Sequence, residues 1–115
     1  MYRFDGNTIY LTRGDTLRAS LSIKQNDSDY TPQAGDSIRF ALKRSDMKHD
    51  RSGFIDSKPL ILKNIPIDTM VLRLDSEDTK DLKFGVYIYD IQITMKDGTV
   101  DTFITDKIYI TPEVD

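Results

Sequence analysis

The fold is decided by one stretch of the chain, Gly85-Val86-Tyr87-Ile88-Tyr89-Asp90-Ile91-Gln92-Ile93-Thr94-Met95. It alternates with a period of two: Tyr87, Tyr89, Ile91, Ile93 and Met95 share one face, and Ile88, Asp90, Gln92 and Thr94 share the other. Such alternation predicts a strand that is buried on one side. The Asp97-Gly98 pair that follows is expected to supply the positive φ angles of a tight hairpin. The stretch therefore predicts the central strand of an antiparallel β domain.

Two earlier segments repeat one pattern and extend this prediction. The first opens with Gly14-Asp15 and the second with Gly35-Asp36. In each, glycine permits a positive φ and the aspartate side chain can accept hydrogen bonds from nearby backbone N–H groups. An alternating strand follows each turn. The inward-facing positions are expected to be Leu17, Ala19, Leu21 and Ile23 in the first strand, and Ile38, Phe40 and Leu42 in the second.

The remaining elements complete an all-β domain. Further strands are predicted at 8–11, 59–63, 70–74, 99–105 and 107–111, with a single helical turn at 75–82 and loops at 25–34 and 44–57. The total is seven to eight strands in one domain over residues 1–115, which predicts an antiparallel immunoglobulin-like β-sandwich. Its predicted core consists of Leu17, Leu21, Ile38, Phe40, Leu72, Leu74, Tyr89, Ile91 and Ile93.

Composition excludes several classes of function. The net charge is −3 and the two signs are interspersed, so the basic stripe of a nucleic-acid binder is absent. No apolar run approaches the length of a membrane span, and the N-terminus lacks the apolar region of a secretory signal. The chain has no cysteine, which excludes disulfides and thiolate metal sites. We therefore expect no nucleic-acid partner and no membrane partner.

Four motifs have both a functional and a plain structural interpretation, and the structural one is favoured each time. Arg13-Gly14-Asp15 matches an integrin-binding tripeptide, but the same Gly-Asp step recurs at 35–36 without the arginine, so a turn explains both. Asn26-Asp27-Ser28 matches a glycosylation pattern. The acidic residues of 75–81 lack the spacing of a Ca²⁺ loop and suit the start of a helix. His49, the single histidine, lies in a polar loop without a nucleophile motif. We expect no catalytic residue, no metal and no cofactor, and hence no enzyme.

Gly85 and Tyr87 together suggest a tyrosine corner, in which a phenol at the start of a buried strand bonds back to the backbone. Tyr89 then stands where antibody domains place a cysteine. The alternative is that Tyr87 is an ordinary half-buried strand residue. The residues expected to matter structurally are Gly14, Asp15, Gly35, Asp36, Gly85, Tyr87, Tyr89 and Gly98.

The order of these motifs resembles a known family. The matching segments are Leu11-Thr12-Arg13-Gly14-Asp15-Thr16, Gly35-Asp36-Ser37-Ile38-Arg39-Phe40, Asp78-Thr79, Gly85-Val86-Tyr87-Ile88-Tyr89-Asp90-Ile91, the Gly98 hairpin and Thr102. They resemble small phage and prophage virion domains, notably the N-terminal immunoglobulin-like domain of baseplate upper proteins. The resemblance implies a tail- or baseplate-associated structural protein without catalytic residues. It would be made in the bacterial cytoplasm and would assemble with other phage structural proteins or with copies of itself as a homo-oligomer.

A second interpretation remains open at this point: a carbohydrate- or surface-binding accessory module of a bacterial extracellular protein. It requires an exposed row of aromatic side chains. The candidates are Tyr2, Phe4, Tyr10 and Phe54.

Overall fold

The computed structural model describes residues 2–25, 28–44 and 59–112, which form an all-β sandwich with one short helix. Within this part of the chain there are ten strands and one helix: β1 (Tyr2–Asp5), β2 (Thr8–Thr12), β3 (Leu17–Ser20), β4 (Ile23–Gln25), β5 (Ser28–Tyr30), β6 (Ser37–Arg44), β7 (Ile61–Ile65), β8 (Val71–Leu74), α1 (Ser76–Thr79), β9 (Gly85–Thr94) and β10 (Val100–Thr111). None of its helices is long and apolar enough to cross a membrane.

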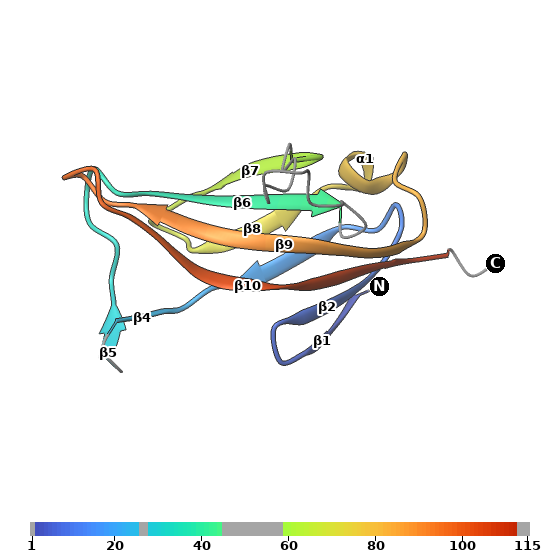
Figure 1. Cartoon of the computed structure of the whole chain (residues 1–115), viewed down its shortest axis with the longest axis horizontal. Helices are drawn as coiled ribbons and strands as arrows, with labels where there is room; N and C mark the ends of the chain where they lie inside the picture. Colours follow the sequence, from blue (N-terminus) through green and yellow to red (C-terminus); the bar gives the residue numbers. More distant parts are fainter. Residues whose placement is uncertain (1, 26–27, 45–58, 113–115) are drawn as a thin grey trace, which may run out of the picture.

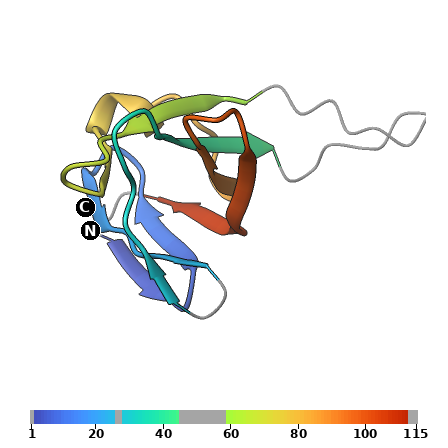
Figure 2. The ribbon, with the colours of Figure 1, turned by 90° about the vertical axis from the view of Figure 1, so that its left-hand side faces the viewer.

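The strands form one large sheet and two small ones. The large sheet has six strands in the order β1-β2-β10-β9-β6-β7, and the long strands β6, β9 and β10 lie side by side (Figure 1). The pair β3-β8 forms the second layer over part of this sheet. The pair β4-β5 forms a hairpin that projects away from the body of the domain (Figures 1 and 2).

The predicted alternation of β9 is confirmed. Tyr87, Tyr89, Ile91 and Ile93 are all buried, because they face the second layer. Met95, which follows the strand, is half-buried. Of the nine predicted core residues, all are buried except Leu21, which packs against the core while remaining partly exposed. The core is therefore where the sequence predicts it.

Four features of the strand pattern differ from the prediction. The predicted strand that carries Leu17, Ala19, Leu21 and Ile23 is divided into β3 and β4, and Leu21 lies between them. The segments 99–105 and 107–111 form one strand, β10, which is irregular between Thr102 and Ile104 and so keeps its pairing with β9 over its length. The strands β1 and β5 were not predicted, since both are short and largely exposed. The sandwich is also not wholly antiparallel, because β10 pairs with β2 in parallel.

The turns at the glycine-aspartate pairs form as predicted, with one correction. Gly14, Gly35 and Gly98 all have positive φ. In the hairpin between β9 and β10, however, only Gly98 has a positive φ, and Asp97 does not. The turn is closed instead by backbone bonds of Met95 with Thr99 and with Gly98, at 2.7 and 2.8 Å. A loop longer than two residues explains why a single positive φ suffices.

Candidate functional site

The tyrosines of β9 have structural contacts. The hydroxyl of Tyr87 donates to the carbonyl oxygen of Lys83 at 2.6 Å, the back-bond expected of a tyrosine corner. The hydroxyl of Tyr89 donates to the carbonyl oxygen of Asn7, in the turn between β1 and β2. Burial, with a smaller contribution from the carboxylate of Asp106, raises the pKa of Tyr89 to about 12. Tyr89 thus fixes the β1–β2 hairpin to the core as a neutral donor.

The carboxylate of Asp36 accepts three hydrogen bonds. Its buried carboxylate accepts from the Gln33 N–H at 2.9 Å, the Tyr30 hydroxyl at 2.7 Å and the Lys96 N–H at 3.1 Å. The bond from Gln33 and then that from Tyr30 hold the pKa of this carboxyl below its usual value. A side chain at Gly35 would meet the Lys96 Cβ at 2.8 Å, so these two turns are in close contact. Asp36 therefore has a structural role.

The Arg13-Gly14-Asp15 segment is also a structural turn. The N–H of Gly14 donates to the hydroxyl of the fully buried Thr79 at 2.9 Å, and the Asp15 N–H donates to the Thr12 carbonyl at 3.1 Å. The guanidinium of Arg13 lies 4.2 Å from the centre of the Phe84 ring. The turn thereby joins the start of the chain to the helical turn. Thr79 is a contributor that the sequence alone does not reveal.

The acidic cluster is used for capping and ion pairs. Asp75 precedes α1, and its N–H donates to the Asp78 carboxylate at 2.7 Å. Asp78 also pairs with Lys63 at 3.0 Å, and Asp75 with Arg73 at 2.7 Å. Among the described residues no three His, Cys, Asp or Glu side chains are grouped so as to hold a metal ion.

Several predicted features lie outside the described residues. These are His49, Asn26 and Asp27 of the glycosylation pattern, Phe54, and all of the polar loop 44–57 except Arg44.

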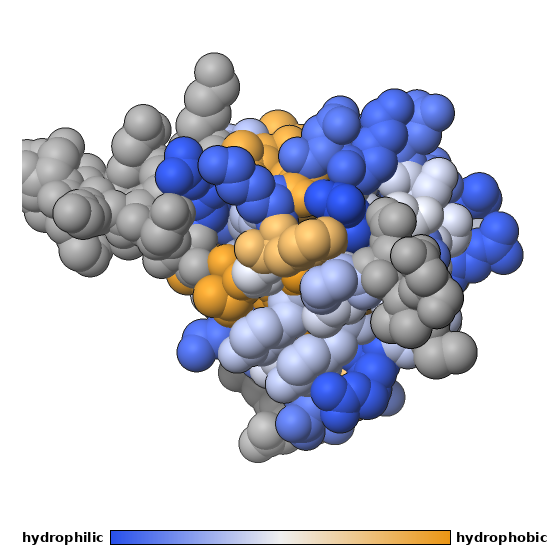
Figure 3. Space-filling model, turned by 90° about the vertical axis from the view of Figure 1, so that its right-hand side faces the viewer, coloured by the Kyte–Doolittle hydropathy of each residue, from blue (hydrophilic) through white to orange (hydrophobic). Residues whose placement is uncertain are grey.

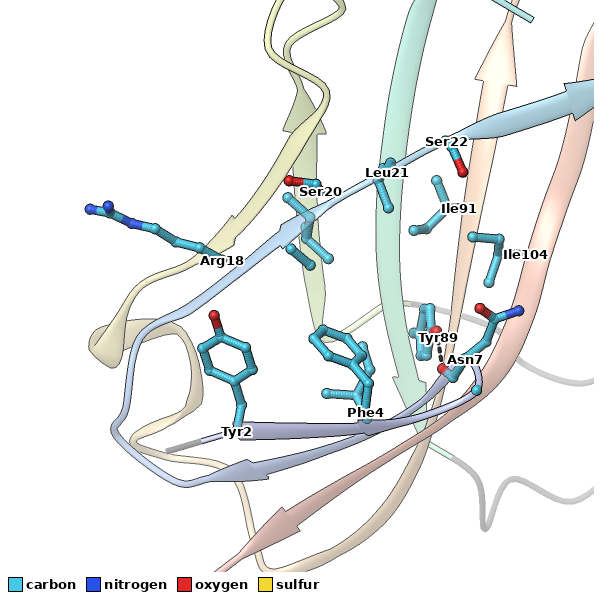
Figure 4. Close-up of a pocket in the computed structure, with 14 residues that line it drawn as sticks. Tyr2, Phe4, Asn7, Arg18, Ser20, Leu21, Ser22, Tyr89, Ile91 and Ile104 are labelled. Atoms are coloured by element: carbon cyan, nitrogen blue, oxygen red, sulfur yellow. Dashed lines mark hydrogen bonds between the residues drawn. The ribbon is translucent and has the colours of Figure 1, made fainter. Parts of the chain in front are cut away.

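A groove of about 360 Å³ opens between β1 and β3. Its floor is apolar and includes the buried Leu72 and Ile91 together with the partly exposed Ala19, Leu21 and Ile104. Figure 4 shows Tyr2 and Phe4 pointing from β1 toward β3, with Ser20 and Ser22 along the opposite rim and the Arg18 side chain extending outward from it. Tyr2 is 39% exposed and Phe4 is 44% exposed. The groove marks a place where the two-stranded layer leaves the inner face of the large sheet uncovered.

The rim formed by β3 has an unpaired backbone edge within the part of the chain that the structure describes. The Leu21 N–H donates to the Met70 carbonyl at 2.8 Å, which extends the pairing of β3 with β8. Because successive residues of a strand direct their backbone groups to opposite sides, those of Arg18 and Ser20 point away from β8. The groove thus combines an apolar floor with backbone donors and acceptors along one rim.

The three described aromatic candidates of the carbohydrate interpretation, Tyr2, Phe4 and Tyr10, do not form one row. Tyr2 and Phe4 contact each other edge to face, 5.7 Å between ring centres, on the groove side of β1. Tyr10 is paired with Arg3, not with either of them, and so lies on the opposite face, stacked on Tyr109 at 4.8 Å. Because side chains alternate between the two faces of a sheet, Tyr10 lies on the face opposite to Tyr2 and Phe4.

A second hollow of about 490 Å³ lies at the end of the molecule that holds α1. Leu60, Phe84 and Val86 are exposed there, and Figure 3 shows an apolar area between hydrophilic side chains at this end.

The groove has the composition of a binding surface. Among the described residues that line it, Arg18 is the one with a charged side chain, and no acid and base are paired. Acid–base and nucleophilic catalysis need such a pair within hydrogen-bond reach of the substrate. The groove can provide a ligand with apolar contacts, backbone hydrogen bonds and one positive charge. Sequence patterns missed the groove, since its rims lie on strands that are not neighbours in the chain.

No protein-family model matches this sequence, and no curated protein matches it. Among solved structures, the fold is similar to the crystal structure of CopC from Methylosinus trichosporium OB3b. The similarity has a TM-score of 0.45 at 12% sequence identity and covers 92% of this chain and 85% of that one.

These comparisons correct the functional prediction. The matched structure is a bacterial CopC and not a phage component, which contradicts the virion role and the virion location that the sequence resemblance implied. The carbohydrate-binding alternative gains no support either. At this identity and TM-score the similarity to CopC transfers no ligand and no location to the chain.

Proposed function

We propose that this domain is a non-catalytic recognition module that binds an extended segment of another polypeptide in the groove between β1 and β3. The observation that carries the proposal is the edge of β3 that pairs with no strand among the described residues, beside an apolar floor that is open to solvent. An added strand would satisfy the backbone groups of Arg18 and Ser20 and complete the second layer over the large sheet. This is recognition by β-augmentation, in which main-chain bonds give affinity and alternate side chains give specificity.

The shape of the groove sets the chemistry of the segment. Because side chains alternate along a strand, every second residue of the ligand would enter the floor beside Ala19 and Leu21. Those residues must be apolar, since burial of apolar surface contributes roughly 25 cal/mol per Å². Arg18 favours a carboxylate at the matching end of the segment. The preferred ligand is therefore an extended stretch of alternating apolar and polar residues with one acidic position.

The test starts from a surface-displayed library of random linear peptides, selected on the purified domain. Affinities of the selected peptides are then measured by fluorescence anisotropy for the wild type, Ser20→Pro and Ser20→Ala. Ser20→Pro removes the backbone donor on the open edge, whereas Ser20→Ala retains it and loses only the hydroxyl. One lost backbone bond is expected to weaken binding roughly threefold to tenfold in the proline variant alone.

A third variant tests the floor. Ala19→Phe would fill the groove, and we expect it to abolish binding while circular dichroism shows the fold intact. The proposal is wrong if no selected peptide is sensitive to either Ser20→Pro or Ala19→Phe.

A further inference from the structure

β1 is an edge strand of the large sheet, and its hairpin geometry defines which backbone groups face outward. It pairs with β2 so that Asp5 lies opposite Thr8, and Gly6, with φ +61°, occupies the first position of the turn between them. The residues that flank such a two-residue turn bond to each other. By alternation, Arg3 and Asp5 direct their backbone groups to β2. Those of Tyr2 and Phe4 therefore point to the open side.

The two faces of β1 differ in chemistry. Tyr2 and Phe4 lie on the groove face, partly exposed. Arg3 and Asp5 lie on the other face, and both are exposed. The Arg3 guanidinium sits 4.2 Å from the centre of the Tyr10 ring. The strand thus presents an apolar pair on one side and a basic–acidic pair on the other.

We propose that β1 pairs antiparallel with β1 of a second copy of this chain, with Phe4 opposite Phe4 across a two-fold axis. In that register Arg3 of each copy faces Asp5 of the other, which gives two opposite-charge pairs on the outer face. Opposite charges directly across an antiparallel pair stabilise it, and like charges destabilise it. Tyr2 then lies opposite Gly6 of the second copy, which has no side chain to crowd the ring.

The neighbouring register is disfavoured by the same charges. Directly opposite residues must share a face, so the register moves in steps that keep Tyr2 and Phe4 together on one face. The next such register places Arg3 opposite Arg3 and leaves Asp5 beyond the paired strands. The charge sequence of β1 is therefore self-complementary in one alignment, as an interface between identical copies requires.

The opposite edge strand of the large sheet, β7, has features that block pairing with another chain. On β7, Lys63 points toward the second layer and forms an ion pair with Asp78, and Pro66 follows the strand directly. Inward-pointing charges and prolines are devices that block edge pairing. Residues Tyr2–Asp5 contain neither. The inference goes beyond the proposed function, because pairing of β1 with β1 needs no bound peptide. It would place the grooves of the two copies beside the two-fold axis of the dimer.

Sedimentation velocity over a range of protein concentrations, without any peptide, tests the inference. We expect a dimer fraction that rises with concentration in the wild type. Arg3→Asp and Asp5→Arg each turn two attractive pairs into two repulsive ones, and each should weaken the dimer about tenfold. The double variant Arg3→Asp/Asp5→Arg restores complementarity and should restore the dimer.

Asn64→Asp, a charge change at an exposed position of β7, is the matched control and should leave the dimer unchanged. Circular dichroism checks that every variant folds. A wild type that stays monomeric at all concentrations overturns the inference, as does a double variant that associates no better than the single ones. Neither result bears on peptide binding in the groove, which is measured separately.

Discussion

At the scale of single residues, Tyr87 shows how a phenol can fix the start of a strand. Its ring is buried and its hydroxyl bonds the Lys83 carbonyl at 2.6 Å, within the segment that leads into β9. Tyr87→Phe keeps the ring and removes this donor, so we expect a loss of about 1 kcal/mol in the free energy of unfolding. Urea denaturation measures it, with Tyr109→Phe on the outer face as the control. Equal effects of the two changes would contradict a structural role for the Tyr87 hydroxyl.

Because the pKa of Tyr89 is raised, we expect the free energy of unfolding to fall in alkali. Its pKa is about 12 in the folded state and about 10 in an unfolded chain. The folded state therefore holds the proton more tightly, and the stabilisation is complete below pH 10. It decreases as the pH rises from the unfolded toward the folded pKa.

Thermal melts across this interval should show a steeper decline for the wild type than for Tyr89→Phe, which cannot ionise. Parallel declines would show that Tyr89 is not responsible.

Because the pKa of Asp36 is lowered, we expect its contribution to the free energy of unfolding to be lost in acid. Because its folded pKa lies below the usual carboxyl value, its stabilisation is present above the unfolded pKa and is lost as the pH falls through the folded one. Asp36→Asn should be less stable than the wild type at neutral pH, and the difference should shrink in acid. Urea denaturation at a series of pH values measures this. A constant difference at every pH would mean that the charge of Asp36 does not matter.

At the scale of elements, the alternation along β9 predicts different costs for adjacent positions. Ile91 is 1% exposed and faces the second layer, whereas Gln92 is on the outer face, where it bonds Arg39 and Thr102. Ile91→Ala should destabilise by about 2–5 kcal/mol because it leaves a cavity. Gln92→Ala should cost less than about 1 kcal/mol. Chemical denaturation compares them, and similar costs would mean that the buried face of β9 is assigned incorrectly.

The elements that sequence reasoning predicted are those with strong local patterns. β9 has ten residues of uninterrupted alternation, and β6 follows a Gly-Asp turn that forms as expected. β1 was missed because four exposed residues give too short a pattern. β10 was predicted as two strands, at 99–105 and 107–111, which lie on either side of Asp106. In the fold Asp106 accepts from the Thr8 hydroxyl at 2.9 Å, a contact between opposite ends of the chain.

The candidate site could not be predicted from the sequence, because it depends on contacts between residues far apart in the chain. The groove exists because β1 and β3 lie across from each other, and that depends on the parallel pairing of β2 with β10. No local pattern near residues 2–22 encodes a partner near residue 110. The virion role was inferred from turn and strand motifs, which describe a fold that serves many functions.

At the scale of the whole molecule, one apolar core joins the two layers. Its buried residues come from both β3 and β8 and from five strands of the large sheet, as well as from β4. Because each layer is covered only by the other, separate unfolding of one would expose the whole core. We expect a single cooperative transition, in which far-ultraviolet circular dichroism and tyrosine fluorescence coincide in urea. Separate midpoints for the two signals would show that the layers unfold independently.

Local stability should nevertheless differ between strands, and hydrogen exchange measures it. β9 pairs on both sides, with β10 and β6, and its inner face is buried, so its amides exchange only through global unfolding. Among the described strands, β4 and β5 pair only with each other, and every side chain of β1 is exposed. Their amides should exchange through local opening, with the least protection among the described strands. Peptide added to the groove or dimer formed at β1 should raise protection in β1 and leave β9 unchanged, since β9 already reports the global limit. If β1 were as protected as β9 in dilute, peptide-free protein, it would be as stable as the core. That result would contradict the local opening that we expect of an exposed four-residue strand.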